Sequence, residues 1–198
     1  SFTLGGGSNT LFCSDYPGII VKLTSQEIQR LGTTKISVDA GCNLDALISW
    51  TIANNLSGLE ALSGIPGTVG GAVALNAGAY GQSIKDTLYN VTLYNTHTRQ
   101  TYTYETADLH YWHRSSIFRD KRGQNLLILR AVFKLHPKFR LPEHPKIDVL
   151  KDNDKSTAIS LRKAVLKLRS HFPDPTLKHN AGSFFLNPTI TKQKADQL

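Results

Sequence analysis

The 198-residue chain contains no methionine and only two cysteines, Cys13 and Cys42, which lie far apart. Because even an initiator methionine is missing, we expect the chain to be part of a longer protein. Two distant cysteines form neither a disulfide framework nor a metal motif, and they fit a reducing compartment. No apolar run approaches the roughly 18 residues of a membrane span, and the first ten residues lack the features of a signal peptide. We therefore expect a cytoplasmic protein without a metal site.

A lysine is missing after the first glycine-rich stretch, LGGGSNTLF (4–12). A P-loop requires that lysine, and a dinucleotide-binding fingerprint requires G-x-G-x-x-G at the start of a helix, so neither motif fits. Gly5, Gly6 and Gly7 nevertheless permit positive φ angles and let backbone N–H groups converge on an anion. By itself, the pattern is more typical of a tight turn.

A second glycine-rich stretch, GLEALSGIPGTVGGAVALNAGAYG (58–81), contains seven glycines separated mainly by apolar residues. Flexible linkers carry serine and other polar residues between their glycines, so this stretch is not a linker. Its composition predicts backbone packed closely against a flat or anionic group. The N–H donors suit a pyrophosphate, and the apolar surface suits an aromatic ring system. The alternative is a tightly wound turn beneath a sheet.

The formal net charge is +8, which favours an anionic partner such as a nucleotide cofactor or a phosphorylated substrate. The basic residues become frequent only after about residue 119, in FRDKRGQ and LRKAVLKLRSH. They are not interleaved with aromatic residues, so we expect no nucleic-acid partner.

Strands and helices are predicted without regular βαβ alternation, which indicates an α+β fold. The expected strands are residues 18–23, 34–41, 89–95, 99–106 and 125–136, and the last is apolar enough to be central in a sheet.

Two helices are expected, residues 43–56 with Asn43 as N-cap and residues 156–171 with Ser156 or Thr157 as N-cap. The stretch between the last strand and the second helix, 137–155, is rich in proline and charge and is expected to be a loop. The apolar face of the second helix is expected to comprise Ile159, Leu161, Val165, Leu166 and Leu168.

The two glycine-rich stretches, with IPGTVGGA and NAGAYG in the second, resemble the FAD-binding segments of the UDP-N-acetylenolpyruvoylglucosamine reductase (MurB) family. WHRSSIF (112–118) resembles the Tyr-Arg-x-Ser-x-Phe segment of that family. NAGSFFLNP (180–188) resembles its Gly-Ser-Phe-Phe-Lys-Asn-Pro segment, and FPDP (172–175) also fits. The motifs occur in the right order and cover nearly the whole chain.

The resemblance implies a vanillyl-alcohol-oxidase-type FAD-binding domain over residues 1–172, lacking its N-terminal part. The truncated beginning of a substrate-binding domain would follow over residues 173–198. It also implies that NADPH, as co-substrate, reduces FAD. The enolpyruvyl ether of UDP-N-acetylglucosamine is then reduced to UDP-N-acetylmuramate for peptidoglycan synthesis. The implied partners are this UDP-sugar and NADPH, with no nucleic acid and no membrane, and we expect a monomer.

The resemblance also assigns site residues. Arg114 matches an arginine whose planar fork polarises the substrate carboxylate, and Ser183 matches a serine that donates a proton to carbon. Asn187 matches an asparagine that contacts the substrate. His113, expected on the substrate side as well, stands where the family usually has tyrosine. The implied FAD contacts are Gly5, Gly6, Gly7, Ser8, Asn9, Ser63, Gly64, Ile65, Pro66, Gly67, Gly70, Gly71, Asn76, Ala77, Gly78 and Tyr80. Ile117 and Phe118 are expected either in the core or against the flavin.

Several positions depart from the family pattern. Leu186 replaces a common lysine, no lysine precedes FPDP, and the second acid of the family, a C-terminal glutamate, has no counterpart. Lys178, His171 or His179 could contact the UDP phosphates instead.

Two alternatives therefore stay open. One is another FAD-dependent oxidoreductase of the same fold. Such enzymes often attach FAD covalently, but no histidine lies near either glycine-rich stretch and Cys13 is not in such a motif. The other is a decayed or non-catalytic fragment that keeps the glycine loops.

Overall fold

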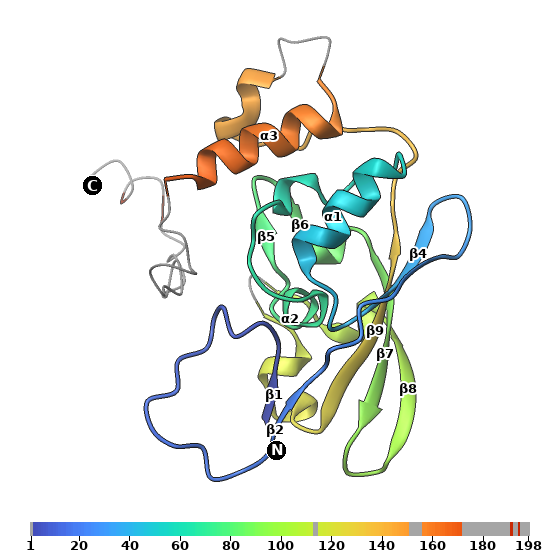
Figure 1. Ribbon diagram of the computed structural model, residues 1–198, viewed down its shortest axis with the longest axis vertical. Helices are drawn as coiled ribbons and strands as arrows, with labels where there is room; N and C mark the ends of the chain where they lie inside the picture. The colour runs from blue at the N-terminus through green and yellow to red at the C-terminus, as the bar shows by residue number, and fades with distance from the viewer. Residues whose placement is uncertain (1, 113–114, 151–155, 172–190, 192–193, 195–198) are drawn as a thin grey trace.

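The chain folds around a five-stranded antiparallel sheet (Figure 1). The computed structural model describes residues 2–112, 115–150, 156–171, 191 and 194. In spatial order the strands are Ile28–Arg30 (β3), Lys35–Asp39 (β4), Leu126–Lys134 (β9), Leu88–Asn95 (β7) and Gln100–Glu105 (β8). β9 is central, as its apolar sequence predicts, because it pairs with both β4 and β7.

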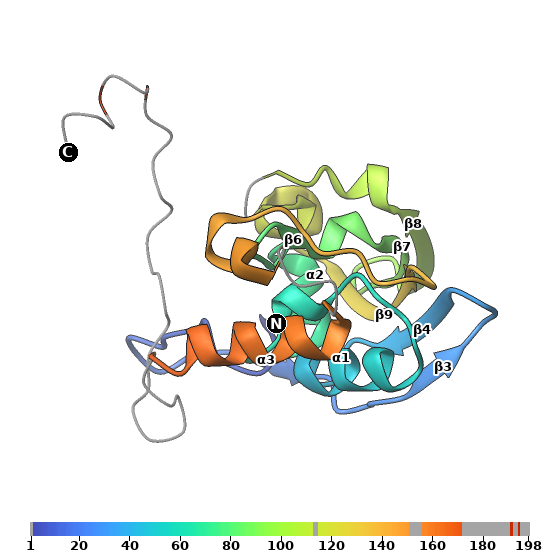
Figure 2. The ribbon, with the colours of Figure 1, turned by 90° about the horizontal axis from the view of Figure 1, so that it is seen from above.

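Two helices pack against one face of this sheet, as Figures 1 and 2 show. α1 (Leu44–Ala53) begins at the predicted cap, since the side chain of Asn43 accepts a hydrogen bond from the N–H of Ala46 at 3.0 Å. α2 (Val69–Ala74) lies beside it. The core between the helices and the sheet is built from fully buried residues, among them Ile36, Val38, Leu47, Ile48, Val69, Val73, Leu93, Ala131 and Phe133.

α2 lies within the second glycine-rich stretch, residues 58–81, where no helix was expected. Gly70 and Gly71 disfavour a helix locally. The side chain of Thr68 nevertheless caps it by accepting from the N–H of Gly71 at 3.3 Å, and two valines bury their side chains in the core. The rest of the stretch and its continuation form Glu60–Leu62 (η1), Gly78–Ala79 (β5), Gln82–Ser83 (β6) and Ile84–Asp86 (η2).

α3 (Ala158–Arg169) lies above α1 in Figure 1 and covers η1. Thr157 is its N-cap, one of the two residues expected, and it accepts from the N–H of Ser160 at 3.1 Å. The predicted apolar face is only partly right: Leu161 and Val165 are fully buried, but Ile159 is 56% and Leu166 is 37% exposed.

α3 and the segment before it form a smaller core. Leu161 and Val165 pack with Ile147, with Leu168 at the edge of the cluster. Ile147 belongs to Pro145–Leu150 (η6), so a 3-10 helix lies where only a loop was expected. The remaining short 3-10 helices are Thr106–Leu109 (η3), Ile117–Arg119 (η4) and Lys121–Gly123 (η5).

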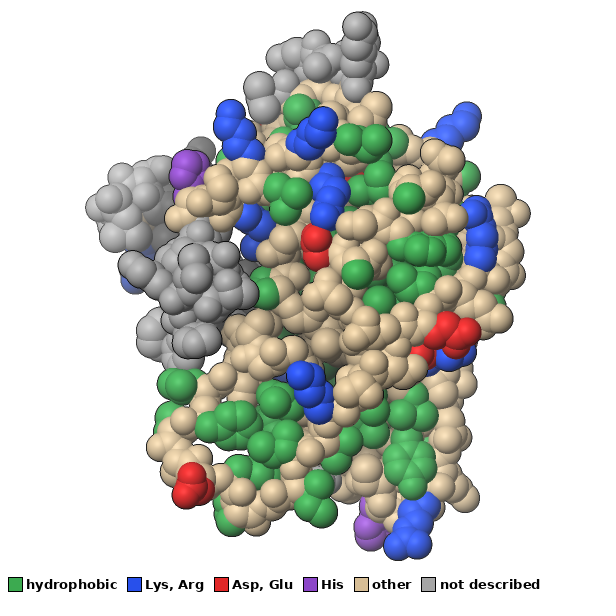
Figure 3. All heavy atoms as spheres, in the orientation of Figure 1, with side chains coloured by type: hydrophobic (Ala, Val, Ile, Leu, Met, Phe, Trp, Pro, Cys, Tyr) green, Lys and Arg blue, Asp and Glu red, His purple; other side chains and the backbone are tan. Residues whose placement is uncertain are grey.

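Phe2–Leu4 (β1) and Ile20–Lys22 (β2) form a separate two-stranded parallel sheet. The loop that joins them carries the first glycine-rich stretch. Apolar side chains on this unit are exposed: the rings of Phe2, Phe12 and Tyr16 contact one another at centroid distances of 5.9 to 6.5 Å. Figure 3 shows hydrophobic side chains gathered in the corresponding lower part of the molecule.

Within the described ranges, no helix is long and apolar enough to cross a membrane. The same residues contain no cluster of three or more His, Cys, Asp or Glu side chains suited to a metal ion.

Candidate functional site

The two glycine-rich stretches, some sixty residues apart in sequence, meet backbone to backbone. A Cβ added to Gly6 would lie 2.8 Å from the Cα of Gly67, and one added to Gly5 would lie 2.9 Å from the Oγ1 of Thr68. The hydroxyl of Ser8 donates to the carbonyl oxygen of Pro66 at 3.0 Å. We call residues 5–8 and 66–71 together the glycine cradle. Its two halves approach so closely that only glycine fits at Gly6.

The two halves of the cradle differ in their free donors. The N–H groups of Gly6, Gly7 and Gly67 donate to no other described residue. Those of Gly70 and Gly71 are already bonded, to the carbonyl of Ala40 and the hydroxyl of Thr68. The expectation that glycine N–H groups along both stretches hold a phosphate is therefore narrowed to the first half and Gly67.

The NAGAY segment connects α2 to the motif around residue 114. Asn76 is buried, with its Nδ2 donating to the carbonyl of Trp112 at 3.2 Å and its Oδ1 accepting from the N–H of Lys85 at 3.2 Å. The N–H of Ala77 donates to the carbonyl of Ala72, and Gly78 lies in β5. Tyr80 packs against His144 at a ring distance of 5.4 Å, in the smaller core. The amide of Asn76 thus already has structural partners.

The described flanks of the WHRSSIF motif are fixed to the C-terminal end of α2. The hydroxyl of Tyr111 donates to the carbonyl of Val73 at 2.9 Å, and that of Ser116 donates to the carbonyl of Ala74 at 2.6 Å. Burial raises the pKa of Tyr111, which keeps its hydroxyl protonated as the donor. Ile117 is buried in the main core, the first of the two expected locations. α2 therefore joins the glycine cradle at one end to this motif at the other.

Comparisons with known proteins agree with this geometry. Residues 2–98 match a family model described as an FAD binding domain. The chain is 35% identical to the UDP-N-acetylenolpyruvoylglucosamine reductase of Neisseria gonorrhoeae, over 98% of this chain and 59% of the relative. It is 34% identical to the enzyme of that name from Flavobacterium johnsoniae, over 100% and 61%. Along nearly its whole length, the chain is similar to proteins of the UDP-N-acetylenolpyruvoylglucosamine reductase (MurB) family.

A solved MurB structure supports the same assignment. The crystal structure of the enzyme from Thermus caldophilus matches with a TM-score of 0.70 and 27% identity, over 98% of this chain and 65% of that one. The α+β class and the FAD-binding domain expected from the sequence are confirmed. The chain spans about three fifths of the length of the curated relatives that it matches.

The substrate-side residues expected from the resemblance to the MurB family lie outside the described residues. These are Arg114, His113, Ser183 and Asn187. The expected boundary between residues 172 and 173 also falls there, so the division into two domains stays a prediction.

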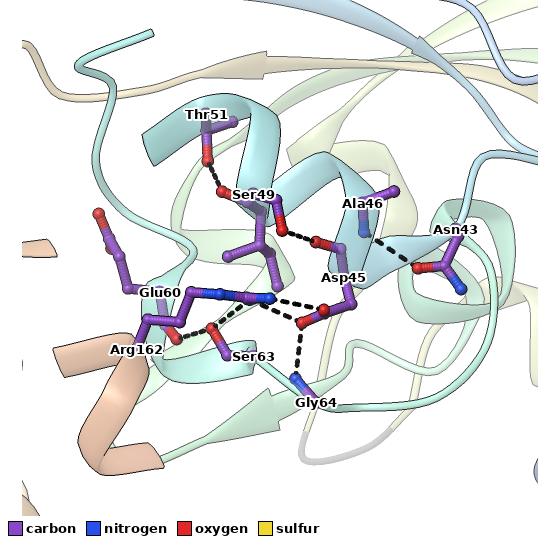
Figure 4. A network of polar contacts seen from close by, with 10 residues as sticks. Asn43, Asp45, Ala46, Ser49, Thr51, Glu60, Ser63, Gly64 and Arg162 are labelled. Atoms are coloured by element: carbon purple, nitrogen blue, oxygen red, sulfur yellow. Dashed lines mark hydrogen bonds and ion pairs between the residues drawn. The ribbon is translucent and has the colours of Figure 1, made fainter. Parts of the chain in front are cut away.

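An ion pair near the glycine cradle, between Asp45 and Arg162, has no signal in the sequence. Arg162 of α3 donates through both Nη atoms to the carboxylate of Asp45 in α1, each at 2.7 Å (Figure 4). Asp45 Oδ1 also accepts from the N–H of Gly64 at 2.8 Å, and Ser63 Oγ accepts from Arg162 at 3.1 Å. The hydrogen bonds from Arg162, helped by the one from Gly64, hold the pKa of Asp45 below its ordinary value against the effect of partial burial. Ser63 and Gly64, both expected flavin contacts, are thus engaged within the protein.

A second carboxylate–arginine pair lies at the β4–β9 edge of the sheet. Asp39 is buried and accepts from Arg130 Nε at 2.9 Å, from the N–H of Glu27 at 3.0 Å and from the hydroxyl of Ser25. Burial by itself would raise the pKa of Asp39, but these hydrogen bonds leave it lowered. The pair joins strands and makes no contact with the glycine cradle among the interactions of the described residues.

Proposed function

We propose that this chain binds FAD at the glycine cradle. The contact between Gly6 and Gly67 carries the proposal, because it exposes unbonded N–H groups where no side chain can intervene. N–H groups without another partner, gathered at one place, suit a pyrophosphate without a neighbouring lysine. These backbone donors would take the place of the lysine that a P-loop carries and that this sequence lacks. The match of residues 2–98 to an FAD binding domain supports the same assignment.

The residues present fit that cofactor. The N–H groups of Gly6, Gly7 and Gly67 would face the diphosphate, with Ser8 and Asn9 beside them. Ser63, Gly64, Ile65 and the 70–71 and 76–80 positions would shape the site from behind rather than donate to it. Bound FAD would supply a two-electron carrier between a nicotinamide cofactor and an unsaturated substrate.

We propose that the whole protein reduces the enolpyruvyl ether of UDP-N-acetylglucosamine to UDP-N-acetylmuramate with NADPH, in peptidoglycan precursor synthesis. The names of the relatives support the substrate, and NADPH is the family's expected reductant. We place this enzyme in the cytoplasm as a monomer, with the UDP-sugar and NADPH as partners and without nucleic-acid, membrane or metal partners.

In this proposal, the protein contributes charge and a proton. Arg114 holds the carboxylate of the substrate, so that negative charge can build next to it when hydride arrives. Ser183 then donates its hydroxyl proton to the adjacent carbon. His113 and Asn187 orient the sugar nucleotide. The tethering of Tyr111 and Ser116 to α2 supports the role of Arg114, since it fixes the flanks of that motif to the helix that starts at the cradle.

The test is an absorbance spectrum of the chain after mixing with FAD and desalting. Retained flavin that is released on denaturation is the expected result. Bleaching of the bound flavin by NADPH, rather than by NADH, and its recovery on adding the enolpyruvyl sugar nucleotide would test the reductase step. Retained flavin that the sugar nucleotide does not reoxidise would favour another FAD oxidoreductase or a non-catalytic binder. Loss of all flavin on desalting would contradict FAD binding by this chain.

A further inference from the structure

We propose that Asp45 and Arg162 are positioning residues for the glycine cradle, and that α3 therefore controls FAD affinity although it lies far from the cradle in sequence. The inference rests on the proposed FAD binding. Three links carry it: the fixed carboxylate, its hold on Gly64, and the packing of α3 on the same glycine.

The first link is the fixed carboxylate of Asp45. It sits in the first turn of α1 and receives three N–H donors, two from Arg162 and one from Gly64, at 2.7 to 2.8 Å. Bidentate arginine–carboxylate pairs combine charge with a defined geometry. Both side chains are partly buried, with 35% of Asp45 and 21% of Arg162 exposed, so solvent screens the pair less than a surface pair. Figure 4 shows Arg162 reaching from α3 across to this carboxylate.

The second link is the segment from Gly64 to Gly67, which the first turn of α1 holds at both ends. Asp45 binds the N–H of Gly64, while the N–H of Leu44 donates to the carbonyl of Gly67 at 3.1 Å. Pro66, between them, accepts the hydroxyl of Ser8 from the other half of the cradle. A shift of Gly64 is therefore transmitted directly to the contact between the two halves.

The third link is the packing of α3 on Gly64. This glycine has a φ of +71°, and a Cβ there would meet Leu166 Cδ2 at 3.0 Å and Arg169 Cδ at 3.1 Å. Gly64 thus donates its N–H to the carboxylate of Asp45, and side chains of α3 lie against its α-carbon. Arg162 joins the two sides and also binds Ser63, the residue before Gly64. The position of α3 and the path of the chain into the cradle are coupled through one guanidinium.

The pair of Asp39 and Arg130 is a matched control. It too joins an arginine to a carboxylate that also accepts a backbone N–H, but it links β4 to β9. If ion pairs in this fold act only on stability, Arg130→Gln and Arg162→Gln should behave alike. If Arg162 positions the cradle, only Arg162→Gln should change the affinity for FAD beyond its effect on folding.

The experiment measures FAD dissociation constants by flavin fluorescence, at a temperature where all variants are folded by circular dichroism. Losing hydrogen bonds to a charged group should weaken FAD binding roughly tenfold in Arg162→Gln. Arg162→Lys, which keeps the charge but not the fork, should recover part of that loss. Arg130→Gln should stay within about twofold of the unmodified chain, because independent sites do not couple.

A second readout needs no FAD and separates this inference from the proposed function. Amide hydrogen exchange of Gly64, followed by NMR in the FAD-free chain, should accelerate in Arg162→Gln and Asp45→Asn but not in Arg130→Gln. The amide signals of Gly6 and Gly67 should shift in the same two variants. Unchanged exchange at Gly64, or equal FAD affinities in Arg162→Gln and Arg130→Gln, would overturn the positioning role. Failure of the unmodified chain to bind FAD would overturn the proposed function instead, while leaving the exchange result to decide on the cradle.

Discussion

The two glycine-rich stretches have similar compositions but different roles. In the first, Gly6 and Gly7 keep their N–H groups unbonded to other described residues. In the second, Gly64, Gly70 and Gly71 donate to Asp45, Ala40 and Thr68. Gly6 and Gly7 offer donors to a ligand, as does Gly67 of the second stretch, whereas Gly64, Gly70 and Gly71 let backbone and side chains pack closely. A count of glycines therefore does not identify a phosphate-binding loop; the destination of each N–H group does.

The largest effect is expected at Gly6, where a substitution should change FAD binding without changing stability. An added methyl would lie 2.8 Å from the Cα of Gly67, so Gly6→Ala should push the halves of the cradle apart. We expect FAD affinity to fall by about a hundredfold, because the displaced N–H groups of Gly6, Gly7 and Gly67 no longer reach the diphosphate together. Because Gly6 is exposed, the melting temperature of the FAD-free chain should change little. Flavin fluorescence titration and thermal unfolding would measure the two effects.

The matched control for that substitution is Gly18→Ala in the same loop. The three atoms nearest to its added methyl all belong to the side chain of Tyr16, which can move aside. Equal FAD affinities in Gly6→Ala and Gly18→Ala would contradict the special role of the contact between Gly6 and Gly67.

The opposite behaviour is expected at Gly70. A methyl there would lie 2.9 Å from the Cβ and 3.1 Å from the carbonyl oxygen of Ala40. Gly70→Ala should lower the free energy of unfolding by about 1–3 kcal/mol, as overpacking does. Chemical denaturation would measure it. A loss of FAD affinity larger than this loss of stability predicts would argue against a purely structural role for Gly70.

A smaller effect is expected at the cap of α2. Thr68→Ala removes the acceptor for the N–H of Gly71 and should cost about 1 kcal/mol of stability. It also releases one donor into the cradle. Thr157→Ala removes the equivalent cap of α3 and is the control. Denaturation midpoints should fall in both variants, and the larger change in FAD affinity is expected for Thr68→Ala, because Thr68 itself lies in the glycine cradle.

The smallest effect is the dependence of stability on pH. The pKa values of Asp45 and Asp39 are lowered in the folded chain, so the unfolded chain binds protons more tightly at these carboxylates. Their contribution to stability is present above the ordinary pKa of aspartate, about 3.9, and is lost as pH falls through the lowered values. Asp45→Asn and Asp39→Asn should each flatten the acid limb of the unfolding curve. An unchanged acid limb in both would contradict the proton linkage.

Much of the sheet and both long helices can be predicted from the sequence because their signals are local. The apolar run of β9, the cap at Asn43 and the cap at Thr157 each depend on neighbouring residues. α2 could not be predicted, because Gly70 and Gly71 disfavour a helix and only burial in the core overrides them. β3 has three residues and little apolar character, so it gives no strand signal.

The site divides in the same way. Both glycine-rich stretches stand out in the sequence, yet nothing in their spacing shows that Gly6 touches Gly67. The pair of Asp45 and Arg162 joins residues on different helices, with no local pattern to reveal it. The prediction that Ile159 and Leu166 belong to the buried face of α3 is wrong, since both are exposed. The spacing of apolar residues along a helix does not show how wide a face the rest of the protein covers.

FAD binding at the glycine cradle requires that the N–H groups of Gly6, Gly7 and Gly67, which donate to no other described residue, receive the diphosphate. The most direct measurement is an NMR titration of the ¹⁵N-labelled chain with FAD, following individual glycine amides. We expect large shifts for Gly6, Gly7 and Gly67, and small ones for Gly70 and Gly71, whose N–H groups are already bonded. Dominant shifts at Gly70 and Gly71, or none at Gly6 and Gly7 under saturating FAD, would contradict it.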